Sequence, residues 1–180
     1  MVKTQNKVFD ERESDLMKNP ESFELIYRQY VNQVFGYLYS ILGNVQDAED
    51  ACAQTFLVVY ESLPRYQAKA SFKSWLFRIA RNKAMDHFRK RKKIVTGELH
   101  QLSVNDDALS QVIQSEQTKI LAEMMKGLPE EDIELLRLRF LAQMTFTEMA
   151  DFLGRKEDTV KKSVYRLIGR LQKQVEGSHA

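Results

Sequence analysis

Apolar residues recur every three to four positions along most of this 180-residue chain, the spacing that gathers side chains on one face of an α-helix. The pattern predicts a first helix that opens at Pro20 and ends at Gly43 and Asn44, which both tolerate the left-handed conformation of a helix C-terminus. Further helices are expected over residues 47–63 and 72–93. No segment alternates as a convincing strand would. The predicted fold class is all-α.

The helix predicted over 72–93 carries two stripes of different chemistry. Its apolar stripe consists of Phe72, Trp75, Leu76, Ile79 and Ala80, so we expect the rings of Phe72 and Trp75 in the core. Phe77 lies off this stripe. A second stripe faces elsewhere and contains Ser74, Arg78, Arg81, Asn82, Met85 and Arg89.

The helical pattern fails after this third helix and divides the chain in two. The segment that follows is mixed, polar and glycine-containing, as linkers are. Helical periodicity resumes around residues 111–126, breaks at Gly127 to Pro129 and returns in a helix expected over 130–143. We therefore predict two small helical domains joined by a flexible linker. The expected parts are an N-terminal extension (1–19), a first domain (20–93), the linker (94–112) and a second domain (113–176).

The last two predicted helices have the spacing of a helix-turn-helix. Phe146, Met149, Ala150 and Leu153 mark the apolar face of the first helix, and Gly154 provides the turn. The second helix has an apolar stripe formed by Val160, Val164, Leu167, Ile168 and Leu171. In such a unit the second helix enters the DNA major groove with its N-terminal end first. The predicted DNA contacts are the basic and hydroxyl residues outside that stripe: Arg155, Lys156, Thr159, Lys161, Lys162 and Arg166.

Charge is distributed unevenly, although the net charge is only +2. Residues 65–93 carry eleven bases and one acid, and residues 155–173 carry seven bases and two acids, whereas 1–61 and 98–151 are acidic. Two basic blocks on predicted amphipathic helices indicate two separate contacts with a polyanion. The alternative is that both blocks are solvated helix faces.

Composition argues against several classes of function. No apolar run approaches the roughly 20 residues that span a bilayer, and the N-terminus lacks the apolar core of a signal peptide, so we expect a cytoplasmic protein that does not insert into membranes. With one cysteine, Cys52, and three scattered histidines, no metal or cofactor is expected. Neither a phosphate-binding glycine loop nor a nucleophile elbow occurs. We therefore expect no catalytic residues and no enzymatic activity.

Four segments together carry a resemblance to a known family. They are AEDACAQTF (48–56), FKSWLFRIARNKAMDHFRKRKK (72–93), LPEEDIELLRLRFLAQMTFTEMADFLG (128–154) and TVKKSVYRLIGRL (159–171). In this order and at this spacing they resemble the extracytoplasmic-function (ECF) sigma factors, the two-domain promoter-recognition subunits of bacterial RNA polymerase. The resemblance covers residues from about 20 to 173.

The resemblance implies two roles for the first domain, called region two in the family. It implies that the helix over 47–63 binds core RNA polymerase through Asp47, Glu49, Asp50 and Gln54. From the residues alone these side chains could equally form a solvated face. The resemblance also implies that the next loop and helix recognise and melt the minus-ten element, holding bases of the single-stranded non-template strand. The candidate contacts are Arg65, Tyr66, Lys69, Ser74, Arg78, Asn82 and Arg89.

For the second domain, called region four, the resemblance implies recognition of the minus-thirty-five element as duplex DNA. Asp158 departs from the family pattern, because a glycine is frequent there; its carboxylate either caps the recognition helix or opposes a phosphate. The resemblance also makes an anti-sigma factor an expected partner.

Two other functions fit parts of the chain. A stand-alone helix-turn-helix regulator that binds duplex DNA as a dimer explains residues 146–173 but leaves the 48–56 and 72–93 segments unexplained. A helical protein that sequesters a partner without contacting DNA makes both basic blocks incidental. Binding by a protein that does not contact DNA should not weaken steeply with salt. Binding to DNA should, because phosphate contacts release counterions.

Overall fold

The computed structural model describes residues 20–67, 71–94 and 127–178, and within them every element is helical. The elements are α2 (Pro20–Leu42), α3 (Val45–Ser62), the 3₁₀ turn η1 (Leu63–Arg65), α4 (Phe72–Ile94), α7 (Glu130–Leu136), the π-helical turn η2 (Arg137–Leu141), α8 (Phe146–Leu153) and α9 (Glu157–Ser178). The all-α prediction is confirmed. The predicted N-terminal extension, the linker after Ile94 and the helix expected over 111–126 lie outside the described residues.

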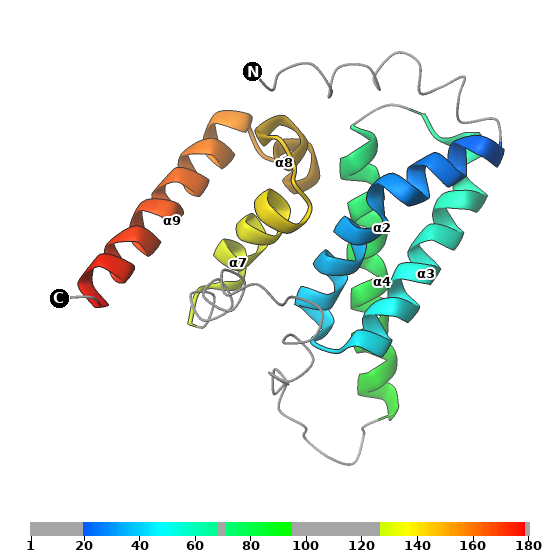
Figure 1. Cartoon of the computed structure of the whole chain (residues 1–180), viewed down its shortest axis with the longest axis horizontal. Helices are drawn as coiled ribbons and strands as arrows, with labels where there is room; N and C mark the ends of the chain where they lie inside the picture. Colours follow the sequence, from blue (N-terminus) through cyan, green and yellow to red (C-terminus); the bar gives the residue numbers. More distant parts are fainter. Residues whose placement is uncertain (1–19, 68–70, 95–126, 179–180) are drawn as a thin grey trace.

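The first three helices form one bundle, which we call the N-terminal module (Figure 1). Gly43, at φ +74°, ends α2 as predicted. The second helix begins at Val45, earlier than expected, because Asn44 caps it: the Asn44 side chain accepts a 2.9 Å hydrogen bond from the Asp47 backbone N–H. Such a cap satisfies one of the free N–H groups at a helix start.

Helix α4 packs its predicted apolar stripe into the core of this module. Phe72, Leu76 and Ala80 are buried, while Trp75 and Ile79 are partly buried and pack against the core. One further ring joins them, since Phe77 is fully buried and meets the ring of Tyr37 edge-on at 5.3 Å between centroids. The buried face of α4 is therefore wider than the predicted stripe.

The remaining helices, α7 to α9, form the C-terminal module. The sequence suggested one uninterrupted helix from Glu130 to Gln143, but α7 gives way to the π-helical turn η2, in which Ala142 N–H donates to the Arg137 carbonyl at 2.9 Å. Gln143 then adopts φ +51° and Met144 N–H donates to the Leu138 carbonyl. The wider turn reverses the chain and aims it into α8.

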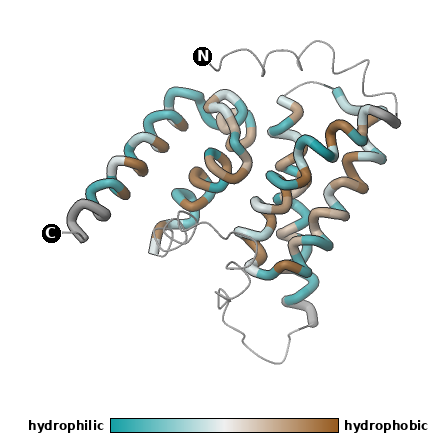
Figure 2. Tube along the Cα trace, viewed as in Figure 1, coloured by the Kyte–Doolittle hydropathy of each residue, from teal (hydrophilic) through white to brown (hydrophobic). Residues whose placement is uncertain are grey.

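The two modules lie against each other along α2 and α4, with α8 packed on α4 and η2 on α2. Figure 1 shows the C-terminal module beside the bundle, with α9 on the side turned away from it. Hydrophilic and hydrophobic positions alternate along each helix, as amphipathic helices require (Figure 2).

Candidate nucleic-acid interface

A helix-turn-helix is built at the C-terminal end from local hydrogen bonds. Thr145 and Glu148 form a capping box at the start of α8: the Thr145 side chain accepts from Glu148 N–H at 3.2 Å, and Thr145 N–H donates to the Glu148 carboxylate at 2.7 Å. Gly154, at φ +63°, ends α8 in the left-handed conformation. Arg155 N–H then donates to the Ala150 carbonyl, which closes the turn before α9.

Helix α9 buries one face and leaves its basic face exposed. Val160, Val164, Leu167 and Leu171 are buried, and Ile168 packs partly buried beside them. All six residues predicted to contact DNA upstream are exposed: Arg155, Lys156, Thr159, Lys161, Lys162 and Arg166.

Their arrangement singles out three of the six. Thr159, Lys162 and Arg166 follow one another at helical spacing and share one stripe, whereas Lys161 lies on another side of α9. Arg155 reaches the carboxylate of Glu131 at 3.4 Å, an exposed pair that costs little to break. Asp158 is exposed in the first turn of α9, where a carboxylate suits the helix dipole.

The residues predicted to contact minus-ten DNA fall into separate groups. Asn82, Arg89 and Arg65 are exposed, and Arg89 forms a surface pair of 3.1 Å with Asp86. Tyr66 is only partly exposed, because its ring packs against Trp75 at 4.7 Å and Phe72 at 5.5 Å. Lys69 lies outside the described residues.

Ser74 and Arg78 are occupied by the C-terminal module. Ser74 is fully buried, and its hydroxyl donates to the Glu148 carbonyl of α8 at 2.7 Å. The Arg78 guanidinium donates to the carbonyl of Asp151, also on α8. Ser74 reaches DNA only if α8 moves away from α4, whereas Arg78 is exposed and has only to leave the Asp151 carbonyl.

The predicted polymerase-binding residues on α3 are also divided. Glu49, Asp50 and Gln54 are exposed. Asp47 is not free: its carboxylate accepts a 2.6 Å hydrogen bond from the Asn44 amide and lies 3.1 Å from His87 Nε2 and 3.7 Å from Arg91.

Two large apolar residues on the same side of α3 were missed by the sequence reasoning. Leu57 and Tyr60 are 57% and 54% exposed, and they follow Gln54 at successive three-residue steps, so they continue its face. The Tyr60 ring contacts Phe23 at 5.2 Å. A signal existed in the sequence, because both lie outside the buried stripe of α3 formed by Ala48, Ala51, Cys52, Thr55, Phe56 and Val59.

Burial shifts the proton affinity of several groups. It raises the pKa of the Cys52 thiol to about 11, which leaves an unreactive neutral thiol at neutral pH. Burial, followed by the neighbouring Glu134 charge, raises the pKa of Tyr37 far above its ordinary value. Burial lowers the pKa of Lys73, whose ammonium donates to the Gln143 carbonyl at 2.9 Å.

Metal-binding clusters and membrane-spanning helices are absent from the described ranges. Within residues 20–67, 71–94 and 127–178, His, Cys, Asp and Glu side chains do not gather in threes that could hold a metal ion. The helices of these ranges also lack a stretch that is both long and apolar enough to cross a bilayer.

The fold and these surfaces define a two-module helical protein with a C-terminal helix-turn-helix. Residues 26–94 match the family model of sigma-70 region 2, and residues 118–171 match that of sigma-70 region 4. The chain belongs to the ECF sigma factors of bacterial RNA polymerase, which are transcription initiation factors.

Curated relatives support this membership. The chain is 32% identical to the ECF RNA polymerase sigma factor SigM of Bacillus subtilis, over 82% of this chain and 91% of that protein. It is 31% identical to BldN of Streptomyces coelicolor over 84% of this chain, which spans 59% of that longer protein.

Solved structures share the fold. CnrH, solved in complex with the cytosolic domain of CnrY, matches with a TM-score of 0.64 at 18% identity, over 92% of this chain and 95% of that chain. RpoE of Bartonella quintana, solved in complex with the anti-sigma factor NepR, matches with a TM-score of 0.64 at 19% identity, over 87% and 98%.

Proposed function

We propose that this chain directs core RNA polymerase to specific promoters by using three separate surfaces. One surface reads minus-thirty-five duplex DNA, a second holds the melted minus-ten strand, and a third binds the polymerase. The observation that carries the proposal is the exposed basic and hydroxyl face of α9, opposite its buried apolar stripe. Such a face is what a recognition helix needs in the major groove.

The upstream surface consists of Thr159, Lys162 and Arg166, with Arg155 and Lys156 at the N-terminal end of α9. Arginine and lysine bind guanine edges or phosphates, and a threonine hydroxyl can do either. Lys161, which points to another side of the helix, is expected to contact backbone phosphate rather than a base.

The downstream surface lies on α4 and the loop before it. Asn82, Arg65 and Arg89 are accessible in the structure, and so is Arg78, although it is hydrogen-bonded to the Asp151 carbonyl. Ser74 becomes accessible only when the modules separate. The work of this surface is to trap bases that leave the stack, because unstacking costs a few kcal/mol per nucleotide. Lys69 is kept as a predicted phosphate contact.

The polymerase-binding surface is the exposed face of α3. Glu49, Asp50 and Gln54 supply the polar part, and Leu57 and Tyr60 supply the apolar part. Protein interfaces commonly combine such an aromatic or aliphatic centre with a polar rim. Asp47 contributes by holding the start of α3 rather than by touching the partner.

The expected partners include an anti-sigma factor. Support comes from the likeness in fold to RpoE, whose structure holds the anti-sigma factor NepR. A chain that works on polymerase and promoter DNA would act in the cytoplasm. The rival reading, a stand-alone regulator, is not favoured, because the region 2 match over residues 26–94 has no role in it.

The deciding experiment mixes the purified chain with core bacterial RNA polymerase and maps transcript starts on fragmented genomic DNA of the source organism. We expect discrete start sites that core polymerase alone does not use. The same chain without polymerase should bind those promoter fragments weakly, since polymerase fixes the separation of the two reading surfaces. Tight, sequence-specific binding by the isolated chain together with no directed transcription would support the stand-alone regulator instead.

A further inference from the structure

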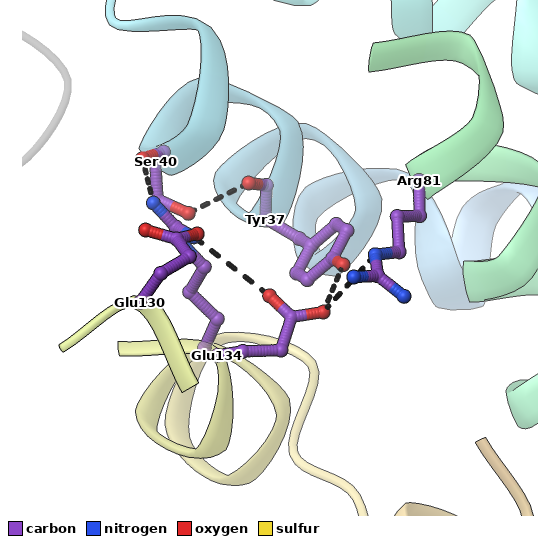
Figure 3. Close-up of polar contacts among 6 residues, drawn as sticks. Tyr37, Ser40, Arg81, Glu130 and Glu134 are labelled. Atoms are coloured by element: carbon purple, nitrogen blue, oxygen red, sulfur yellow. Dashed lines mark hydrogen bonds and ion pairs between the residues drawn. The ribbon is translucent and has the colours of Figure 1, made fainter. Parts of the chain in front are cut away.

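One buried carboxylate joins the two modules. Glu134 of α7 is 8% exposed, and it accepts a 2.8 Å hydrogen bond from the Tyr37 hydroxyl of α2. The same carboxylate oxygen lies 3.7 Å from Nε of Arg81 on α4. Figure 3 shows Tyr37 and Arg81 converging on Glu134 from the N-terminal module. A buried carboxylate depends on such partners, because an unpaired charge in the interior is strongly unfavourable.

A buried cation of the C-terminal module also reaches across this boundary. Arg137 of η2 is 8% exposed and donates to the Ser40 carbonyl of α2 at 2.9 Å. Its guanidinium also pairs with Glu130 at 2.5 Å and with the second oxygen of Glu134 at 3.7 Å. Each of these two buried charges of the C-terminal module therefore reaches a partner in the N-terminal module.

The same contact covers part of the surface proposed for minus-ten DNA. The Ser74 hydroxyl and the Arg78 guanidinium both donate hydrogen bonds to backbone carbonyls of α8. Arg81, the next turn along α4, lies over the Phe152 ring of α8 at 5.9 Å as well as beside Glu134. Meanwhile the proposed polymerase surface, represented by Asp50, Gln54 and Leu57, stays exposed.

We propose that this contact is an autoinhibitory clasp, with Glu134 as its central charge. The proposal rests on the function proposed above. In the free chain the clasp covers Ser74 and holds the exposed Arg78 against α8, so neither is presented freely to single-stranded DNA, while the open face of α3 lets polymerase bind first. Several contacts of the clasp are polar, and contacts of this kind between domains are compatible with relative motion. Separation returns its charges to water, so the closed and open states can interconvert without unfolding either module.

The conformational test measures the distance between spin labels on α2 and α9. Labels are placed at Gln29→Cys and Gln172→Cys, both exposed positions, in a chain carrying Cys52→Ala. Glu134→Gln keeps the shape of the side chain but removes its charge, so the population at longer distance should rise about tenfold or more, as expected when a hydrogen bond to a charged group is lost. The matched control is Glu24→Gln, whose pair with Arg28 lies on the surface within α2, and it should leave the distances unchanged.

The functional test measures binding of the free chain to a fluorescent single-stranded oligonucleotide. The oligonucleotide carries the non-template minus-ten sequence of a promoter mapped in the transcription experiment. Glu134→Gln should bind it at least several-fold more tightly than the unmodified chain and Glu24→Gln do, with no change in duplex binding by α9. If Glu134→Gln fails to fold, Tyr37→Phe removes the hydrogen bond from the other side and should act in the same direction.

Two results would overturn the clasp. One is an identical distance distribution in the unmodified chain and in the folded Glu134→Gln or Tyr37→Phe variant. The other is an open variant whose affinity for the oligonucleotide is unchanged. Failure of the proposed function looks different, because the unmodified chain would then direct no transcription whatever its distances. In that case the distance measurement still decides whether Glu134 holds the modules together.

Discussion

The Asp47 carboxylate lies 3.1 Å from Nε2 of His87, which connects the start of α3 to the later part of α4. Asp47 was expected to face polymerase, yet its partners are Asn44, His87 and Arg91 of its own module. Substituting Asp47 should therefore change the stability of the N-terminal module, whereas substituting an exposed acid of α3 should change affinity for a partner.

Asp47→Ala is therefore expected to lower the free energy of unfolding by about 1 kcal/mol, because it removes a helix-start hydrogen bond and an ion pair. Urea titration followed by circular dichroism measures this loss. The control, Asp50→Ala, alters an exposed side chain and should change stability by less than about 0.5 kcal/mol. Asp50→Ala should instead weaken polymerase binding. The opposite ranking in either assay would show that Asp47 belongs to the partner surface.

Leu57→Ala tests the apolar part of the polymerase surface. Truncation of a central apolar contact typically costs more than about 1 kcal/mol of binding, whereas a residue 57% exposed contributes little to folding. Affinity for core polymerase, measured by fluorescence anisotropy, should fall at least several-fold. Leu25→Ala is the matched control, since Leu25 is 65% exposed on α2, and it should bind normally. Equal effects of both substitutions would argue against a specific role for Leu57.

On the recognition helix, Lys162→Ala and Arg166→Ala should damage use of the minus-thirty-five element and spare polymerase binding. Loss of a base contact costs roughly 1–3 kcal/mol and depends on sequence, while loss of a phosphate contact weakens all sequences alike. Transcription from a cognate promoter and from promoters with single-base changes distinguishes the two cases. Lys173→Ala, exposed further along α9, serves as the control. Unchanged transcription in both variants would contradict the assignment of α9.

The loop before α4 is predicted to help select the minus-ten base. Exchanging residues 65–70 for those of a family member with a different promoter should change the preferred base at the melted element. The base preference is measured with a library of promoters randomised at the minus-ten element. A preference that stays the same while transcription continues would remove the loop from base selection.

Cys52 provides a test of burial that is independent of function. Its pKa is raised to about 11, so iodoacetamide should modify the folded chain very slowly at pH 8.5 and the urea-unfolded chain quickly. Above about pH 9 the unfolded state releases the thiol proton and the folded state does not, so folding stability should fall as pH rises toward 11. The control places the thiol at the exposed neighbouring position, as Ala53→Cys in a chain that also carries Cys52→Ala. This thiol should react rapidly with iodoacetamide in the folded chain.

Helical periodicity was enough to predict the fold class, the ends of α2 and the buried stripe of α9, because those features depend on residues close together in the sequence. It could not predict what covers each polar face. Ser74 and Asn82 lie on the same stripe of α4, yet Ser74 is buried under α8 and Asn82 is exposed. That difference arises from packing between segments more than 70 residues apart, as the Ser74–Glu148 hydrogen bond shows.

Helical periodicity also could not predict local changes in backbone conformation, such as the π-helical turn η2. The turn η2 keeps Leu138 and Ala142 buried, as a continuous helix would, so apolar spacing gives no sign of its extra residue. In the same way, an acid such as Asp47 in the first turn of a helix looks identical in sequence whether it faces a partner or is held by a histidine from another helix.

Glu148 makes two different hydrogen bonds from the first turn of α8. Its carboxylate holds the first turn of α8 through Thr145 N–H, and its carbonyl accepts the Ser74 hydroxyl from α4. The integrity of the DNA-reading motif and the grip on the neighbouring module are thus mechanically linked at a single residue. Fraying of that one turn would release Ser74 at the same moment that it loosens the platform beneath α9, so selection acting on promoter recognition also acts on how readily the molecule opens.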